Sequence, residues 1–423
     1  MIDTTLNPHV IGRGASPTLA INERTKALAA RGRDVYRLGF GQSPFPVPAR
    51  VVESLRANAA AKDYDPSRGL PELRDAVAGW FRRRGVEAHA DNVVIGPGSK
   101  ELIFLVQLAR NSELLLPSPS WVSYAPQAGV LGLPVTWIPT DMEGRWSPTP
   151  EALAHACATP PTRPRLLLLN SPSNPTGVSL RGPQLAALAE VARQHRVLVL
   201  SDEIYGELDH AGAHVSMASH YPEGTIVTGG LSKWCGAGGW RLGTALFPPG
   251  LRWLQEAVVG LASETYSTAA APIQRAAITA YAGGDDLDLY VVRSRRIMAA
   301  LGQAVTRRLT DARVHVASPD GGFYLFPEFG HYREAFAQRD ITTGSELCER
   351  LLEDTGVALL PGAPFGRPVA ELSARLSYVD FDGAAALDAV ASSAEGPVDD
   401  AFLQRHCGRV LEGATRIGAW LRG

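Results

Sequence analysis

The chain of 423 residues has few cysteines, almost no net charge and no long hydrophobic run. Its four cysteines show no C-x-x-C spacing, so the sequence indicates neither a zinc site nor a disulfide framework. Lys and Arg total 41 and Asp and Glu total 43, which gives no general electrostatic attraction to nucleic acid or to an anionic membrane. No apolar run approaches the roughly 18 residues of a membrane helix, and the first residues do not resemble a signal peptide. These absences predict a cytoplasmic protein with reduced thiols and with no metal, nucleic-acid or membrane partner.

Apolar residues make up 45% of the chain and charged residues 20%, a balance typical of a globular protein with a sizeable core. Between about residues 90 and 250, short apolar runs alternate with helix-like stretches such as 100–110 and 182–195, a spacing typical of βαβ units. The expected strands are 93–95, 114–116, 135–138, 166–169, 197–200, 226–228 and 244–247. Several of them are apolar at consecutive positions, as strands buried on both faces must be. This region is therefore predicted to be an α/β domain with a mostly parallel sheet.

A second, smaller α/β unit is predicted toward the C-terminus. Its expected elements are a long helix at 287–310, strands at 314–316, 322–326, 357–360 and 375–379, a helix at 345–353 and a closing helix at 399–422. We divide the chain into an N-terminal arm with part of the small domain (1–45), a large domain (46–290) and a C-terminal small domain (291–423). The Gly/Pro-rich stretch 40–48 is expected to be an extended loop.

The most informative run surrounds Lys233, which directly follows a predicted strand and lies among small residues in 229–243. A lysine on such a turn lies at the carboxyl edge of a parallel sheet, where ligands of open α/β folds bind. Loss of hydration there would free the amine as a nucleophile. The alternative is a solvated loop lysine, and only the pattern around Lys233, with Arg241 eight positions later, argues against it.

Two other strand ends carry polar residues that would suit a reactive lysine. Asp202 ends one apolar strand, and Tyr205 follows three residues later. Asn174 lies in a turn-rich loop after the strand 166–169. Asp202 could be a simple helix N-cap and Asn174 a plain turn former, so each signal is weak alone. Their order and setting make them candidate site residues.

Taken together, three motifs make the sequence resemble the class I/II aminotransferases, enzymes of the fold-type-I family that depends on pyridoxal 5'-phosphate (PLP). The motifs are S-K-x(6)-W-R-x-G at 232–243, N-P-T-G at 174–177 and S-D-E-I-Y at 201–205, in the family's order. The resemblance is closest to the bacterial branch of aspartate and aromatic aminotransferases, and it covers the chain from Gly41 to Tyr378. It implies a large domain with a mostly parallel seven-stranded sheet sandwiched by helices, plus a smaller α/β domain.

The resemblance also implies roles around the cofactor ring. Lys233 matches the lysine that holds PLP as a Schiff base and moves a proton between the substrate α-carbon and the cofactor. Asp202 matches the acid that pairs with the pyridine nitrogen and favours its protonated form. Asn174 and Tyr205 match the pair that hydrogen-bonds the phenolic oxygen, and Trp121 matches the aromatic residue that stacks on the ring. A core tryptophan is the alternative for Trp121.

For the cofactor phosphate, the resemblance implies a guanidinium from Arg241 and backbone N–H groups from Gly98, Ser99 and Lys100 at the start of a helix. Ser232 could add a hydroxyl group. Many relatives carry a serine three residues before the lysine, whereas this chain has glycine at that position. One phosphate contact of the family is therefore missing or replaced.

Three further positions concern the substrate and the partner subunit. Arg375 matches the arginine that binds the substrate α-carboxylate, with Asn174 beside it and with the backbone of Gly41 close to the same group. Tyr64 matches a tyrosine that reaches the phosphate of the neighbouring subunit, which implies a homodimer with shared active sites. The predicted substrates are therefore an L-α-amino acid and a 2-oxo acid.

The predicted function is a PLP-dependent aminotransferase that works by a ping-pong mechanism. Glu264 and Tyr266 would disfavour a second substrate carboxylate, and four aromatic residues could line an apolar pocket or belong to the core: Tyr36, Phe40, Phe45 and Phe323. We therefore lean toward aromatic or other apolar donors. A lyase, decarboxylase or oxidase on the same scaffold is the enzymatic alternative, because fold and cofactor do not determine the reaction. A non-catalytic PLP-binding regulatory protein is the alternative from another class.

Overall fold

A seven-stranded sheet forms the centre of the larger body in the computed structural model, which describes residues 5–12, 14–393 and 396–423. The strands are β2 (Val93–Gly96), β3 (Glu113–Ser118), β4 (Val135–Pro139), β5 (Arg165–Asn170), β6 (Leu198–Asp202), β7 (Thr225–Gly230) and β8 (Gly243–Leu246). Their order in space is β2-β8-β7-β6-β5-β3-β4, and β8 runs antiparallel to both neighbours. The predicted strands and the mostly parallel sheet are confirmed.

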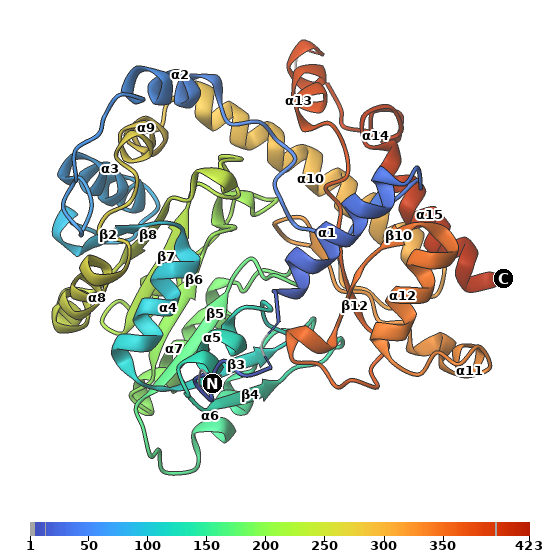
Figure 1. Cartoon of the computed structure of the whole chain (residues 1–423), viewed down its shortest axis with the longest axis horizontal. Helices are drawn as coiled ribbons and strands as arrows, with labels where there is room; N and C mark the ends of the chain where they lie inside the picture. The colour runs from blue at the N-terminus through green and yellow to red at the C-terminus, as the bar shows by residue number, and fades with distance from the viewer. Residues whose placement is uncertain (1–4, 13, 394–395) are drawn as a thin grey trace.

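Helices cover both faces of this sheet (Figure 1). They are α2 (Ala49–Asn58), α3 (Pro71–Arg82), α4 (Ser99–Arg110), α5 (Tyr124–Val130), α6 (Pro150–Cys157), α7 (Gly182–Gln194), α8 (Arg252–Thr265) and α9 (Ala271–Ala282). In β5, Leu166 and Leu168 pack in one cluster with residues of α4 and α8, whereas Leu167 and Leu169 pack in another with residues of α6 and α7. Alternate side chains of one strand thus enter two cores, and each buried leucine contributes about 1.5–3 kcal/mol relative to an exposed one.

The smaller body is built from both ends of the chain. Its elements are α1 (Pro17–Ala30), β1 (Tyr36–Arg37), α10 (Asp285–Asp311), β9 (Tyr324–Leu325), α11 (Arg333–Ala337), α12 (Gly344–Thr355), β10 (Val357–Ala358), β11 (Leu360–Pro361), β12 (Ala374–Ser377), α13 (Gly383–Ser392), α14 (Asp400–His406) and α15 (Gly408–Arg422). The long helix α10 runs from the sheet body into this one (Figure 1). β1 pairs with β10, while β11, β12 and β9 form an antiparallel sheet.

The small body differs from the predicted elements in four places. The expected strand 357–360 is divided into β10, which pairs with β1, and β11, which pairs with β12. The expected strand 314–316 is reduced to an isolated bridge between His315 and Glu328, and the expected strand 322–326 is limited to β9. The predicted closing helix is broken at Cys407, whose non-helical backbone separates α14 from α15. This break lets residues of both helices, including Leu403 and Val410, reach the same core.

The division at 45/46 and 290/291 stays a prediction, and residues 1–4 and 13 of the predicted arm lie outside the described residues. α10 crosses the second boundary, and β1 joins the N-terminal segment to the small body.

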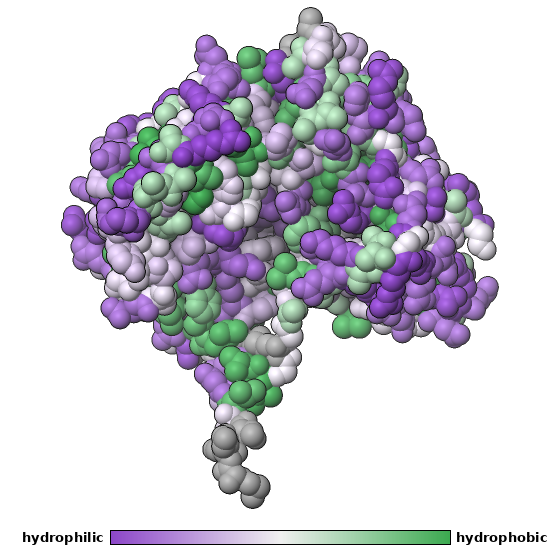
Figure 2. Space-filling model, turned by 45° about the horizontal axis from the view of Figure 1, so that its top comes forward, coloured by the Kyte–Doolittle hydropathy of each residue, from purple (hydrophilic) through white to green (hydrophobic). Residues whose placement is uncertain are grey.

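The surface shown in Figure 2 is hydrophilic over most of its area, with hydrophobic residues gathered toward its lower end. The N-terminal segment carries three of the exposed large hydrophobic side chains, Leu6, Val10 and Ile11. Among the described residues, no helix is both long enough and apolar enough to span a membrane.

Candidate active site

Asp202 is the buried acid at the carboxyl end of β6, with only 3% of its surface exposed. The Tyr124 hydroxyl donates to its Oδ2 at 2.7 Å, and the Thr228 hydroxyl donates to its Oδ1 at 3.2 Å. Burial raises the pKa of Asp202 to about 6, while these hydrogen bonds and the charge of Lys233 act in the opposite direction. A cation beside this carboxylate would stabilise its ionised form.

Lys233 follows β7 in the loop that leads to β8. Its Nζ donates to the Gly41 carbonyl oxygen at 2.9 Å and lies 5.5 Å from the ring centroids of both Tyr205 and Phe323. No carboxylate of the described chain forms an ion pair with Lys233. The amine is thus hydrogen-bonded to a neutral acceptor and lies beside two aromatic rings. It has no ion pair that would have to break before it could act as a nucleophile.

Arg375 lies on β12 with 1% of its surface exposed. Its Nη1 donates to Asn174 Oδ1 at 3.0 Å, its Nη2 donates to the Gly39 carbonyl at 2.7 Å, and its Nε has no partner. Burial lowers the pKa of this guanidinium. A buried cation that contacts neutral acceptors only and keeps an unused N–H is suited to an anionic ligand.

The hydroxyl of Tyr205 links the regions around Lys233 and Arg375. It accepts a long hydrogen bond of 3.5 Å from Asn174 Nδ2 and lies 2.9 Å from the Tyr324 hydroxyl, which in turn lies 3.4 Å from the Gly41 carbonyl. Burial raises the pKa of Tyr205 well above its usual value. Lys233 and Tyr324 therefore both contact the Gly41 carbonyl, and the predicted residues Gly41, Asn174, Tyr205, Lys233 and Arg375 form one continuous network.

A second part of the site surrounds the start of α4. Gly98 has a φ of 98°, and a Cβ there would lie 2.2 Å from Arg241 Nη2, so the close approach of the guanidinium requires glycine. Arg241 donates to the carbonyls of Gly238 and Pro97 at 3.0 and 3.3 Å. No side chain caps α4, so the N–H groups of Ser99 and Lys100 are free to bind an anion beside Arg241.

Lys100 and Trp121 lie next to this corner. Lys100 Nζ is 5.1 Å from the Trp121 ring centroid, and burial, with the charges of Arg241 and Lys233, lowers the pKa of Lys100. Trp121 also makes an edge-on contact with Tyr124, which binds Asp202. The aromatic residue predicted to stack on a cofactor ring is therefore connected to the predicted ring-nitrogen partner.

Two predicted residues have fewer contacts with the others. Ser232 is partly buried directly before Lys233. Tyr64 is 88% exposed and makes no contact with the site of its own chain. Its loop is nevertheless held firmly, because the neighbouring Asp65 forms a two-bond ion pair with Arg275.

Sequence reasoning missed four members of the site: Gly39, Tyr124, Thr228 and Tyr324. Tyr124 and Thr228 provide the two side-chain hydrogen bonds to Asp202, and Tyr324 contacts Tyr205. Thr228 ends the expected strand 226–228, so a hydroxyl at a predicted strand end was the available signal there, whereas Tyr124 lies three residues after Trp121. No local signal in the sequence marks Gly39, whose contribution is a backbone carbonyl.

The four aromatic residues considered for a substrate pocket differ in their surroundings. Tyr36 lies against Arg409 and Arg416, and Phe45 packs edge-on against Tyr290 and Phe381, so both belong to the core. Phe323 is fully buried in the same core and also lies beside Lys233. Phe40 is partly buried directly before Gly41.

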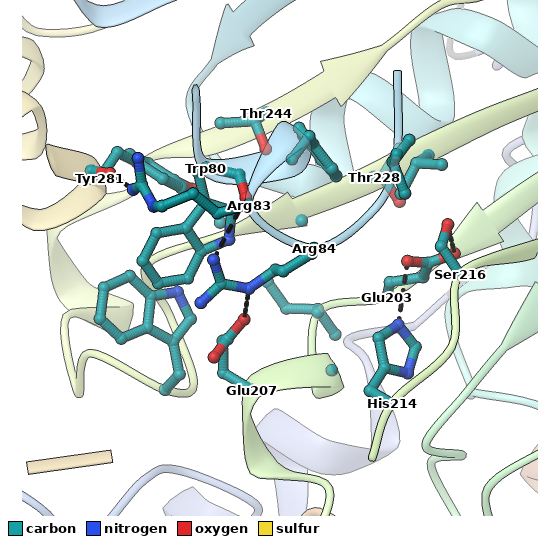
Figure 3. A pocket seen from close by; sticks show the side chains of 18 of the residues that line it. Trp80, Arg83, Arg84, Glu203, Glu207, His214, Ser216, Thr228, Thr244 and Tyr281 are labelled. Carbon is teal, nitrogen blue, oxygen red and sulfur yellow. Dashed lines mark hydrogen bonds and ion pairs between the residues drawn. The ribbon is translucent and has the colours of Figure 1, made fainter. Parts of the chain in front are cut away.

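A separate cavity of about 380 Å³ lies near the ends of β6 and β7 (Figure 3). None of the predicted site residues lines it. Most of its charged groups are paired: Arg84 and Arg295 both contact Glu207, and His214 Nε2 lies 3.0 Å from Glu203 Oε2. Arg83, which also lines the cavity, donates to the carbonyls of Tyr281 and Ala282. This region thus contrasts with the unpaired cations around Lys233 and Arg375.

The arrangement fits PLP as judged by its donor set. A buried acid can face a ring nitrogen, hydroxyl and amide groups can face a ring oxygen, and a helix start with an arginine can bind a phosphate. The unpartnered Nε of the buried Arg375 provides a further position for a substrate carboxylate.

Comparison with known proteins supports the same conclusion. The family model "Aminotransferase class I and II" matches residues 33–382. The aspartate aminotransferase of Geobacillus stearothermophilus is 36% identical over 90% of this chain and 94% of its own length, and the asparagine–oxo-acid transaminase of Streptococcus mutans is 35% identical over 89% and 95%. The structure of Thermus thermophilus aspartate aminotransferase with maleate has a TM-score of 0.82 and 28% identity, covering 93% of this chain and 99% of that one. This chain therefore belongs to the class I and II aminotransferases and is a PLP-dependent aminotransferase.

Proposed function

We propose that Lys233 is the catalytic lysine of this aminotransferase and that Arg375 binds the α-carboxylate of its amino-acid and 2-oxo-acid substrates. The observation that supports this most is that two cations, Lys233 and Arg375, converge on one hydrogen-bonded network without a carboxylate partner. The Lys233 amine would accept the proton from the substrate Cα and deliver it to the aldehyde carbon of the cofactor, C4'. Arg375 would fix the substrate so that this Cα–H bond faces Lys233.

When bound, PLP supplies an aldehyde that captures the substrate amine and a ring that withdraws electrons from the substrate Cα. Asp202 would hold the proton of the ring nitrogen, because an ionised carboxylate favours the cationic form. Asn174 and Tyr205 would bind the phenolic oxygen, and Trp121 would lie on the ring face. The phosphate would be bound by Gly98, Ser99, Lys100, Ser232 and Arg241.

We also propose that the protein forms a homodimer and is located in the cytoplasm. A homodimer is favoured by Tyr64, a large aromatic side chain that is 88% exposed on a loop tied down by the Asp65–Arg275 pair. The exposed apolar residues Leu6 and Ile11 of the N-terminal segment also suit a contact with a second copy. A cytoplasmic location is favoured by four cysteines that are all free and buried.

For the amino donor we favour an aromatic or other apolar side chain. Near Lys233 and Arg375 the structure places three rings, those of Phe323, Tyr324 and Phe365. Glu264 and Tyr266 are not cationic, so neither offers a positive charge for a second carboxylate. Glu264 is exposed, and the Tyr266 hydroxyl donates to the Ile95 carbonyl. A dicarboxylate donor is the second candidate, because one of the relatives and the solved structure compared above are named for aspartate.

Two measurements test this proposal. Borohydride reduction of the holoenzyme followed by peptide mapping should place the cofactor on Lys233, and a label on any other lysine would refute the assignment. A donor–acceptor panel should then give higher kcat/KM for phenylalanine than for aspartate with 2-oxoglutarate as acceptor. The opposite order would reject the apolar preference while leaving the role of Lys233 intact.

A further inference from the structure

Tyr324 connects the two bodies of the molecule at the active site. It lies on β9 with 1% of its surface exposed, and β9 pairs with β12, the strand that carries Arg375. Its side chain reaches Tyr205, which follows β6 in the larger body. One buried side chain therefore contacts both the proposed carboxylate site and the proposed cofactor site.

The ring of Tyr324 is one of two rings against the Arg375 guanidinium. The Cζ atom of Arg375 lies 4.7 Å from the centroid of Tyr324 and 5.2 Å from that of Phe365. Because no carboxylate of the described residues pairs with Arg375, these rings and two neutral oxygen acceptors are the groups that stabilise its buried charge. The rings also restrict the plane in which its unpartnered Nε can meet a ligand.

The hydroxyl of Tyr324 contacts Tyr205 and Gly41 rather than Arg375. It lies 2.9 Å from the Tyr205 hydroxyl and 3.4 Å from the Gly41 carbonyl, which also accepts from Lys233. The single proton of the Tyr324 phenol can go to only one of these two oxygens. The contact with Tyr205 is the shorter one, and the Gly41 carbonyl already accepts from Lys233, so we assign the proton to the Tyr205 oxygen. The proton of Tyr205 is then free to point toward another acceptor, and accepting a hydrogen bond makes Tyr205 a stronger donor.

The packing around Tyr324 leaves little freedom for it to move. A Cβ at Gly41 would lie 2.0 Å from the Tyr324 hydroxyl oxygen and 2.5 Å from its ring carbon Cε1. The loop residue predicted from the sequence as a substrate contact is therefore a glycine because the tyrosine lies directly against it. This contact holds the ring beside Arg375 and the hydroxyl beside Tyr205 at the same time.

We propose that Tyr324 is a positioning residue with two separable functions: its ring orients Arg375 toward the substrate carboxylate, and its hydroxyl directs the proton of Tyr205 toward the cofactor. This inference rests on the proposed roles of Arg375 and Tyr205. It predicts that removing the hydroxyl and removing the ring have different consequences.

The test compares Tyr324→Phe, which keeps the ring, with Tyr324→Leu, which removes it. For Tyr324→Leu we expect KM for the amino donor to rise at least about 10-fold with kcat changed less than about 3-fold. Binding of 3-phenylpropionate, measured by calorimetry, should weaken by the same factor, while binding of its amide should not change. Phe365→Leu should weaken binding of the acid in the same way, and it keeps the test valid if Tyr324→Leu fails to fold.

For Tyr324→Phe we expect KM within about 2-fold of the wild-type value. The pH midpoint at which the visible absorbance of the holoenzyme changes should rise by about half a unit or more, because a weaker hydrogen bond from Tyr205 lets the cofactor hold its proton more tightly. Tyr332→Phe, which removes a hydroxyl bonded to the Ala312 carbonyl away from the site, serves as the control and should change neither quantity.

The outcomes separate this inference from the proposed function. If Arg375→Lys leaves KM and acid binding unchanged, the carboxylate role of Arg375 is wrong. If Arg375→Lys weakens binding but Tyr324→Leu and Phe365→Leu do not, the ring function of Tyr324 is wrong. An unchanged absorbance midpoint in Tyr324→Phe would reject the function of its hydroxyl.

Discussion

Two polar regions lie at the ends of β6 and β7, and they differ in whether their charged side chains have partners of opposite charge. In the cavity of Figure 3, Glu207 pairs with Arg84 and Arg295, and His214 lies against Glu203. In the active site, Lys233 and Arg375 bind only carbonyl and amide oxygens. Most charged groups of the cavity are paired within the chain, whereas Lys233, Arg241 and Arg375 of the active site have no carboxylate partner among the described residues and can bind anionic ligands.

The difference has a physical basis. A buried cation without an anion loses its hydration and gains little in return, so it weakens the folded state unless something else binds it. Charged pairs within the chain stabilise the fold, whereas an unpaired buried cation is suited to binding an anionic ligand. Substitutions in the cavity should therefore change the free energy of unfolding, and substitutions in the active site should change binding or the reaction rate.

The largest effect is expected from Lys233→Ala. The variant loses both the amine that holds the cofactor and the base at the substrate Cα, so kcat should fall by about 10⁴-fold or more. The visible absorbance of covalently held PLP should disappear, while the melting temperature of the cofactor-free protein should stay close to wild type. Retained absorbance together with retained turnover would show that another lysine carries the reaction.

Arg375→Ala should give the largest effect on KM. Charged two-bond contacts contribute about 1.5–3 kcal/mol, so KM for amino acids should rise roughly 10- to 150-fold. KM for simple amines, which lack the carboxylate, should change far less.

Arg84→Ala is the matched control from the paired region. Arg84 is partly exposed, and Glu207 keeps Arg295 after its removal, so we expect a destabilisation of about 1 kcal/mol or less and an unchanged KM. If Arg84→Ala raised KM as much as Arg375→Ala, the contrast between the two regions would not hold.

Much of this contrast could be predicted from the sequence, because strand ends and motifs are local features. Asp202, Asn174 and Lys233 each follow or end an apolar run, and parallel strands bring their carboxyl ends to one edge. Arg375 could be predicted as buried and in need of a partner because it begins an apolar strand. The seven strands of the sheet followed from the same runs.

The remaining features depend on contacts between distant segments. The sequence does not reveal that Arg375 meets the carbonyl of Gly39, because that carbonyl belongs to a residue 336 positions away. The core positions of Tyr36 and Phe45 likewise follow from contacts with Arg409 and Phe381 in the small body. Cys407 interrupts a regular amphipathic pattern only because both helices pack into one core.

Asp202→Asn should slow the reaction by less than Lys233→Ala does. The amide cannot carry the negative charge that favours a protonated ring nitrogen, so proton removal at the substrate Cα should slow by about 10²- to 10³-fold. The affinity for PLP, measured by fluorescence titration, should change only a few-fold, because most of the proposed cofactor contacts remain. Unchanged turnover would exclude an electronic role for this carboxylate.

The smallest expected effect is a difference in pH dependence between Asp202 and His214. Both have raised pKa values in the folded state: burial raises that of Asp202 to about 6, and Glu203 raises that of His214 against the opposing effect of burial. A raised pKa means that the folded protein binds the proton more tightly, so its contribution to stability is present at low pH and disappears as pH rises through the folded value. For Asp202 the loss falls between about pH 4 and 6, and for His214 it begins above about pH 6.5.

Urea unfolding of the cofactor-free protein across this range should therefore show two separate decreases in the free energy of unfolding. Asp202→Asn should remove the first decrease, and His214→Gln should remove the second. Adding PLP should reduce the first decrease and leave the second, because only Asp202 would meet the cationic ring. If PLP altered both equally, the cavity and the active site would be electrostatically coupled, and the separation between binding and stabilising charges would fail at the ends of β6 and β7.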